Sequence, residues 1–158
     1  MFFHGTLIDL ETTGLPNQQN SEVVTLGIVS GNELKIVQRT VEENFEAHVR
    51  ELIRGLPRPF YAFNKVFEEQ MLGIEIDREL QAEEFEKKRE AIKIMGLHDP
   101  FDGLGYKVVD AWNNYITSHD KHHLCLIMNH NEACLLLETC LAIVRWRRRY
   151  KGYWHAEK

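Results

Sequence analysis

The feature that constrains the fold most is an apolar run near the start of the chain, FFHGTLIDL at residues 2–10. A strand that is apolar on both of its faces is typical of the centre of a sheet covered on both sides. Residues 23–29 and 33–41 predict two further strands, joined by a hairpin turn at residues 30–32. We therefore expect a sheet built around residues 2–10.

The rest of the chain alternates between helical and extended patterns. The elements expected there are a helix over 42–54, a strand over 58–63, a helix capped by Asn64 with Phe67, Met71 and Leu72 buried, a short strand over 73–76, and helices over 82–95, over 106–116, from about Asp120 with a break or bend near Asn129, and over 131–150. This order predicts an α/β domain with a mixed β-sheet flanked by α-helices. The length of 158 residues fits a single domain spanning 1–158.

Composition excludes some classes of protein. No apolar run approaches the roughly 20 residues that a membrane helix needs, so we expect no membrane partner. The first residues lack the basic start and the cleavage site of a signal peptide. The three cysteines lack the CxxC spacing of a zinc or redox site, so we expect a reducing, cytoplasmic compartment.

Two carboxylates end the first strand, in IDLETTG. Asp9 and Glu11 are two residues apart and so point to the same face. Like charges that close are costly unless a cation lies between them, and Mg²⁺ prefers carboxylate oxygens. Thr12, Thr13 and Gly14 follow and can offer hydroxyl and N–H groups to a nucleotide at the carboxyl end of the strand. On spacing alone, two polar residues at a strand exit are an equally good interpretation.

The string IDLETTGLP over Ile8–Pro16 resembles the first motif of the DEDD superfamily of 3′–5′ exonucleases, which have a ribonuclease-H-like fold. The resemblance implies that Asp9 and Glu11 are catalytic residues that bind two divalent cations, Mg²⁺ or Mn²⁺. It also implies a ribonuclease-H-like sheet and single-stranded DNA or RNA as the substrate.

The second motif of that family is a strand, an Asn, and then Phe-Asp on a helix. YAFNKVFEEQML at Tyr61–Leu72 is similar, with Asn64 and Phe67 on the spacing of the family and Glu68 in place of the usual Asp. The resemblance implies that Glu68 is a catalytic metal ligand and that Asn64 contacts the substrate. The alternative is that Asn64 only caps a helix and Glu68 is a solvated surface residue.

The third motif is matched less well. MNHNEACLLLETCLAI at 128–143 is similar to the branch with an aromatic residue, Asn, two residues and Asp. The resemblance implies that His130 is the general base and that Asn131 contacts the substrate; a hydrogen-bonded helix histidine is the alternative for His130. Cys134 takes the place of the fourth carboxylate, and a thiolate is a poor ligand for Mg²⁺. Glu138, one turn further on, either replaces the missing acid as a metal ligand or is a partly exposed helix residue.

Three weaker groups complete the candidates. Asp99, Asp102 and Asp110 receive no catalytic role, with Asp110 a reserve metal ligand. A short-spaced group could hold zinc, although Asp120 is more simply a helix cap: His119, Asp120, His122 and His123. The segment Arg145–Trp154 carries five cations among aromatic residues. These residues suit single-stranded nucleic acid, or simply the C-terminus of a helix.

The expected function is therefore a metal-dependent nuclease, a 3′–5′ exonuclease that hydrolyses single-stranded DNA or RNA by a two-metal-ion mechanism. One alternative, favoured by Cys134, is a catalytically inactive ribonuclease-H-like module that binds nucleic acid or protein. A structure-selective endonuclease is another. The net charge of −5 neither predicts nor excludes a nucleic-acid partner, and a homodimer stays open.

Overall fold

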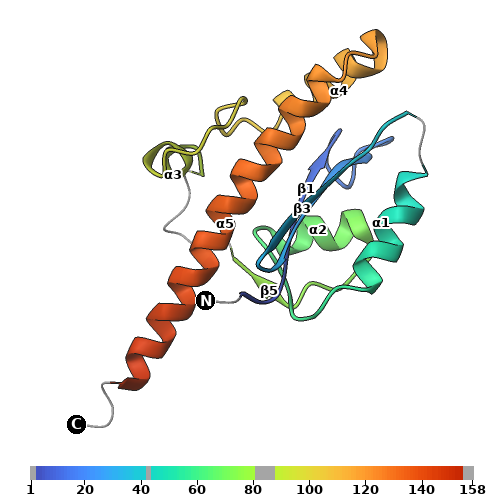
Figure 1. Ribbon diagram of the computed structural model, residues 1–158. Coiled ribbons are helices and arrows are strands. Elements are labelled where there is room, and N and C mark those ends of the chain that lie inside the picture. The colour runs from blue at the N-terminus through green and yellow to red at the C-terminus, as the bar shows by residue number, and fades with distance from the viewer. Residues whose placement is uncertain (1–2, 42–43, 81–87, 155–158) are drawn as a thin grey trace.

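The computed structural model describes residues 3–41, 44–80 and 88–154, which alternate between strands and helices (Figure 1). The strands are β1 (Phe3–Thr12), β2 (Val23–Gly31), β3 (Glu33–Gln38), β4 (Phe60–Ala62) and β5 (Arg78–Glu79). The helices are α1 (Phe45–Arg54), α2 (Lys65–Leu72), α3 (Lys88–Ile94), α4 (Lys107–Ser118) and α5 (His122–Trp154). None of the helices in these ranges is long and apolar enough to cross a membrane.

The strands form a five-stranded sheet in the order β3-β2-β1-β4-β5. β1 pairs antiparallel with β2 and parallel with β4; β2 pairs antiparallel with β3, and β4 pairs parallel with β5. The apolar run at residues 2–10 is thus the central strand, as its composition predicts. The mixed sheet flanked by helices confirms the expected α/β class and is consistent with a ribonuclease-H-like fold.

Alternation along β1 sends its side chains to two different layers. Ile8 and Leu10 pack with residues of α1 and α2 on one face of the sheet. On the other face Leu7 packs with Leu135 of α5. Figure 1 shows α1 and α2 on one side of the sheet and the long α5 crossing the other. The odd-numbered residues of β1 therefore face α5, and this places the two carboxylates at the end of the strand beneath that helix.

The last helix is longer than expected. α5 runs unbroken from His122 to Trp154, so the predicted break near Asn129 is wrong. The side chain of Asn129 is exposed, while Ile127, His130 and Asn131 on the opposite face are buried. Asn lowers helix propensity by well under about 1 kcal/mol, and the packing of the buried face outweighs that cost.

The start of α1 and the segment after α2 also differ from expectation. α1 begins at Phe45 because the side chain of Asn44 caps it, accepting a hydrogen bond from the Ala47 N–H at 3.4 Å. Residues 73–76 do not form a strand: Gly73 ends α2 with φ of +66°, and the next strand is β5. α3 covers the end of the helix expected over 82–95, and residues 42–43 and 81–87 lie outside the described part.

The buried face of α2 is not the one expected. Phe67, Met71 and Leu72 pack only partly buried against the core, whereas Glu68 is 3% exposed. An acidic residue is thus the most deeply buried side chain of this helix. Glu68 is therefore not the solvated surface residue of the alternative interpretation.

Candidate active site

Two carboxylates and one amide meet where β1 passes under α5. Asn131 donates from Nδ2 to Asp9 Oδ2 at 2.9 Å and to Glu11 Oε1 at 3.4 Å. All three side chains are buried, with exposed fractions of 0% for Asn131, 6% for Asp9 and 7% for Glu11. The expected same-face placement of Asp9 and Glu11 is therefore observed, and one amide group lies within hydrogen-bonding reach of both carboxylates.

A glycine makes room for this amide. Gly27 on β2 pairs with Asp9 on β1, directly below Asn131. A Cβ at position 27 would lie 2.1 Å from Asn131 Oδ1 and 2.5 Å from Leu135 Cδ1. The close approach of α5 to the β1–β2 pair thus requires glycine at this position.

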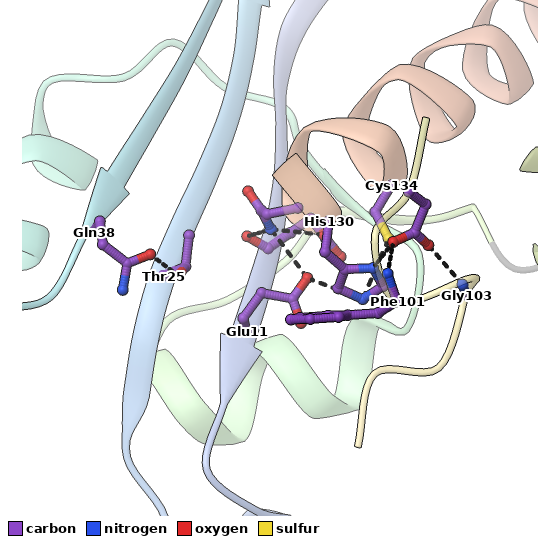
Figure 2. Close-up of polar contacts among 10 residues, drawn as sticks. Glu11, Thr25, Gln38, Phe101, Gly103, His130 and Cys134 are labelled. Carbon is purple, nitrogen blue, oxygen red and sulfur yellow. Dashed lines mark hydrogen bonds and ion pairs between the residues drawn. The ribbon is translucent and has the colours of Figure 1, made fainter. Parts of the chain in front are cut away.

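His130 lies beside the carboxylates and is held from both ends of its ring. Its Nδ1 is 2.8 Å from Asp99 Oδ1, and its Nε2 is 3.7 Å from Glu11 Oε1 and 4.0 Å from Cys134 Sγ. Phe101 packs on the imidazole with ring centroids 5.2 Å apart. Figure 2 shows the imidazole lying between Glu11 and Cys134. The expectation that His130 and Cys134 share one helix face is confirmed.

Asp99 is the contact that the sequence reasoning missed. Its Oδ1 accepts a hydrogen bond from the Phe101 N–H at 2.8 Å, and its Oδ2 accepts one from the Gly103 N–H at 2.6 Å. Its carboxylate therefore accepts from His130 Nδ1, which leaves Nε2 facing Glu11 and Cys134. The only signal in the sequence was an Asp at the start of a turn, and that pattern does not indicate a partner 31 residues away.

Three of these residues form a candidate metal centre. Glu11, His130 and Cys134 each offer a ligand atom, and these atoms lie within 4.8 Å of one another. Among the described residues this is the one such group of three or more His, Cys, Asp or Glu side chains. Cys134, expected to weaken a metal site, is thus part of it.

Glu68 belongs to α2, which contacts β1 and β4. At 3% exposure it is not the solvated residue of the alternative interpretation. The cap alternative for Asn64 is observed, since its Oδ1 accepts a hydrogen bond from the Phe67 N–H at 3.3 Å. Glu68 is not a member of the three-residue group, so its role as a metal ligand stays a prediction, as does substrate binding by Asn64.

Glu138 is fully buried on α5, so the alternative of a partly exposed helix residue is wrong. It lies two turns beyond His130, and eight residues of α-helix extend about 12 Å along the axis. The group formed by Glu11, His130 and Cys134 does not include it. Replacement of the fourth carboxylate by Glu138 therefore stays a prediction.

Thr12, the last residue of β1, and the residues that follow it make hydrogen bonds within the loop that begins there. Thr12 Oγ1 donates to the Gly14 carbonyl at 2.7 Å, and Thr13 Oγ1 accepts from the Glu22 N–H at 2.9 Å. Gly14 approaches Gln18 so closely that a Cβ there would lie 2.4 Å from Gln18 Oε1. These contacts shape the loop at the carboxyl end of β1, and binding of a nucleotide by Thr12, Thr13 or Gly14 stays a prediction.

Apart from Asp99, the weaker candidates are not part of the centre. Asp110 is exposed on α4, and Asp102 pairs with Lys93 at 3.4 Å. Asp120 accepts from the His122 N–H at 2.9 Å, which is the capping role expected of it. Within the ranges described, no group of three metal ligands includes His119, Asp120, His122 or His123. The side chains of Arg145–Trp154 lie outside the described part of the chain.

A cavity of about 260 Å³ lies away from these residues. It is lined by residues of α1, the end of α2 and the residues that follow it, namely Val49, Arg50, Ile53, Arg54, Leu72, Gly73 and Ile74. These residues carry no carboxylate or histidine, unlike the buried polar cluster under α5.

The oxygen ligands fit a hard cation, and the thiol does not. Asp9 and Glu11 are buried carboxylates on one strand face, the donor set that Mg²⁺ and Mn²⁺ prefer. A sulfur ligand such as Cys134 favours softer ions. Mg²⁺ or Mn²⁺ therefore fits the Asp9 and Glu11 side of the cluster.

Comparisons of the chain with models of protein families, with curated proteins and with solved structures each found no match.

Proposed function

We propose that this protein is a metal-dependent nuclease, a 3′–5′ exonuclease that hydrolyses single-stranded DNA or RNA with two divalent cations. The observation that supports this most is the convergence of Asp9 and Glu11 on β1 with His130 on α5, beneath a helix that crosses a mixed α/β sheet. The polarity and the single-stranded substrate come from the resemblance of the motifs. The three cysteines lack the CxxC spacing of a zinc or redox site, and this supports action in the reducing cytoplasm.

Asp9, Glu11 and Glu68 would hold Mg²⁺ or Mn²⁺ through their carboxylate oxygens. Bound there, the cations would stabilise charge on the phosphate and on the oxygen that leaves. Asn131 contributes by orienting two of these carboxylates, because its amide donates to Asp9 and to Glu11. Asn131 is on this account a positioning residue, and the substrate contact expected for it stays a prediction.

His130 is the proposed general base. Nδ1 of His130 donates its hydrogen bond to Asp99, and this leaves the lone pair of Nε2 available. In the proposed step, water attacks phosphorus, its proton passes to Nε2, and the bond between phosphorus and the leaving oxygen breaks. Asp99 holds the imidazole in the required tautomer and orientation, the role a carboxylate has in other acid–base sites.

A binding module without catalytic activity is the second candidate. The observation that favours it is the buried thiol of Cys134, 4.0 Å from His130 Nε2, where the resemblance places the fourth carboxylate. With a thiol there, the second cation has one oxygen ligand fewer. Such a protein would bind single strands without shortening them.

A strand-degradation assay tests the proposal. Purified protein is incubated with 5′-labelled single-stranded DNA or RNA and with Mg²⁺, Mn²⁺ or EDTA. We expect products that shorten from the 3′ end, and their loss with EDTA. Asp9→Asn should abolish the reaction, since it removes a charged ligand, and His130→Ala should slow it about 10²- to 10⁴-fold. A circular strand should stay intact, because an exonuclease needs an end.

Glu51→Ala is the matched control, because Glu51 is an exposed acid on α1, away from the cluster. It should degrade substrate like the wild type. Wild-type activity in Asp9→Asn would refute the assignment, and cutting of the circle would point to an endonuclease. If no strand is shortened with any metal but single strands are bound, the protein is the binding module.

A further inference from the structure

We propose that Glu11, His130 and Cys134 form a binding site for Zn²⁺, and that Zn²⁺ bound there inhibits hydrolysis. The binding part stands on the geometry of the three side chains alone. The inhibition rests on the function proposed above.

The ligand atoms are already close to the spacing of a zinc site. His130 Nε2 is 3.7 Å from Glu11 Oε1 and 4.0 Å from Cys134 Sγ, and all three ligand atoms lie within 4.8 Å of one another. In a tetrahedral site with usual zinc bond lengths, neighbouring ligand atoms are about 3.4–3.6 Å apart. Small side-chain movements would therefore complete the site.

The chemistry of the donor set selects among divalent cations. A thiolate and an imidazole favour Zn²⁺ over Mg²⁺, and a carboxylate oxygen is a common third zinc ligand. Three protein ligands leave a fourth position for water. Asp9 and Glu11 by themselves offer only oxygen, the donor that Mg²⁺ prefers. Glu11 is common to both sites, so His130 and Cys134 are the ligands that make this site selective for Zn²⁺.

The surroundings hold the ligands in place before any ion binds. Asp99 contacts His130 Nδ1 at 2.8 Å, so the other ring nitrogen is turned toward Glu11 and Cys134. Histidine ligands of metals almost always donate their other ring N–H to a carboxylate, a backbone carbonyl or water, and Asp99 is in place as such a partner. His130 and Cys134 are one helical turn apart on α5 and so share a face. The exposed fractions of the three ligands are 7% for Glu11, 3% for His130 and 2% for Cys134.

Inhibition follows from the shared nitrogen. In the proposed hydrolysis, His130 Nε2 takes a proton from water, but in the zinc-bound form the same lone pair is held by the metal. One atom cannot do both, so Zn²⁺ should lower the rate that Mg²⁺ or Mn²⁺ supports.

Cobalt(II) is the probe, since it takes zinc sites and its thiolate complexes absorb in the near ultraviolet. The protein to titrate is the double variant Cys125→Ala/Cys140→Ala, which removes the two exposed cysteines and leaves Cys134 as the sole thiol. We expect a thiolate-to-cobalt band that saturates at one equivalent and disappears when Zn²⁺ is added. Asp99→Asn in that background should weaken cobalt binding about 10- to 100-fold.

Further substitution of Cys134→Ser in the double variant should abolish the band. If the double variant itself shows no thiolate-to-cobalt band while its circular-dichroism spectrum is native, the proposal is overturned. Cobalt binding without a thiolate band would also overturn it, because the ion would then be held elsewhere, for example by the exposed surface at His122.

Activity separates this proposal from the proposed nuclease function. A stoichiometric thiolate band without strand degradation would support the zinc site and refute the nuclease. Degradation with Mg²⁺ and no band would support the nuclease and refute the site. With both present, we expect one equivalent of Zn²⁺ to inhibit the double variant; a rate unchanged by Zn²⁺ would refute the inhibition.

Discussion

At the scale of single residues, the site depends on how α5 is seated above two strands. Asn131 reaches Asp9 because Gly27, the partner of Asp9 on β2, has no side chain between them. The amide and the glycine thus act together, one supplying the donor and the other the space. A methyl group at position 27 should therefore disturb the carboxylates through Asn131.

Gly27→Ala tests this coupling. Its Cβ would overlap Asn131 Oδ1 at 2.1 Å and Leu135 Cδ1 at 2.5 Å, and both of those residues are fully buried. We expect a loss of about 1–3 kcal/mol in the free energy of unfolding, as is usual for overpacking, measured by urea denaturation.

Gly105→Ala is the matched control for that measurement. A Cβ at Gly105 meets no atom within 4 Å, and its φ is not in the left-handed region. Its stability should change by less than about 0.5 kcal/mol, as for most surface substitutions. Equal effects of the two substitutions would contradict the tight contact at Gly27.

At the scale of elements, the long α5 and the short strands β4 and β5 differ in how much of the fold they contact. α5 packs against β1, β2, β3, α3 and α4, so it connects most of the layer on its side of the sheet. β4 and β5 pair through two residues each. The packing of side chains therefore contributes more to the stability of β4 and β5 than their short pairing does. In α5, the effect of intrinsic helix propensity on stability can be measured at the exposed positions.

Asn129→Ala tests the continuity of α5. In an exposed position inside a helix, Ala is favoured over Asn, so the free energy of unfolding should rise by about 0.5 kcal/mol. Asn64→Ala is the contrast: Asn64 caps α2, and its loss should lower stability by about 1 kcal/mol. Destabilisation by Asn129→Ala in urea denaturation would mean that the helix is interrupted there.

The contacts of Asp77 predict a dependence of stability on pH. The Phe60 N–H donates to Asp77 Oδ2, and the Arg58 guanidinium lies 2.9 Å away. These contacts hold the pKa of Asp77 below its ordinary value of 3.8. A lowered folded-state pKa contributes stability above pH 3.8 that is lost as pH falls through the folded-state value.

We therefore expect Asp77→Asn to be less stable than the wild type near neutral pH, with the difference shrinking as pH falls below 3.8. Thermal unfolding of both proteins over a series of pH values measures this, and other carboxyl groups cancel in the comparison. A difference that stays constant or widens in acid would contradict the contacts assigned to Asp77.

At the scale of the whole molecule, β1 is the element on which the other layers depend. It pairs with β2 and β4, packs against α1 and α2 through one face and against α5 through the other, and ends at the candidate site. Opening β1 would therefore require most of the core to separate, whereas β5 lies at an edge of the sheet.

Native-state hydrogen exchange should show this difference. Hydrogen-bonded amides of β1 should exchange only by global unfolding, with a free energy in the usual range of roughly 5–15 kcal/mol. Amides of Arg78 and Glu79 in β5 should exchange by local opening at lower free energy. Equal protection of the two strands, measured by NMR at increasing denaturant, would contradict this ranking.

Local patterns in the chain were enough to predict the strands β1 to β4 and the caps at Asn64 and Asp120, but not β5. The apolar composition of residues 2–10 indicates a central strand, and the two-residue spacing of Asp9 and Glu11 puts them on one face, because strand side chains alternate. The spacing of His130 and Cys134 likewise predicts a shared helix face. These properties depend on backbone geometry over a few residues, so they can be predicted from the sequence without knowing which other element packs against them.

Only the tertiary structure decides which groups meet across the layers. Asn131 contacts Asp9 from 122 positions away, and His130 contacts Asp99 from 31. Glu138 is buried although its local pattern allowed exposure. Periodicity predicts which face of α5 is buried, but it does not predict which residues that face contacts. Those contacts depend on how closely α5 packs against the sheet. That closeness is set by long-range packing, here by the missing side chain of Gly27.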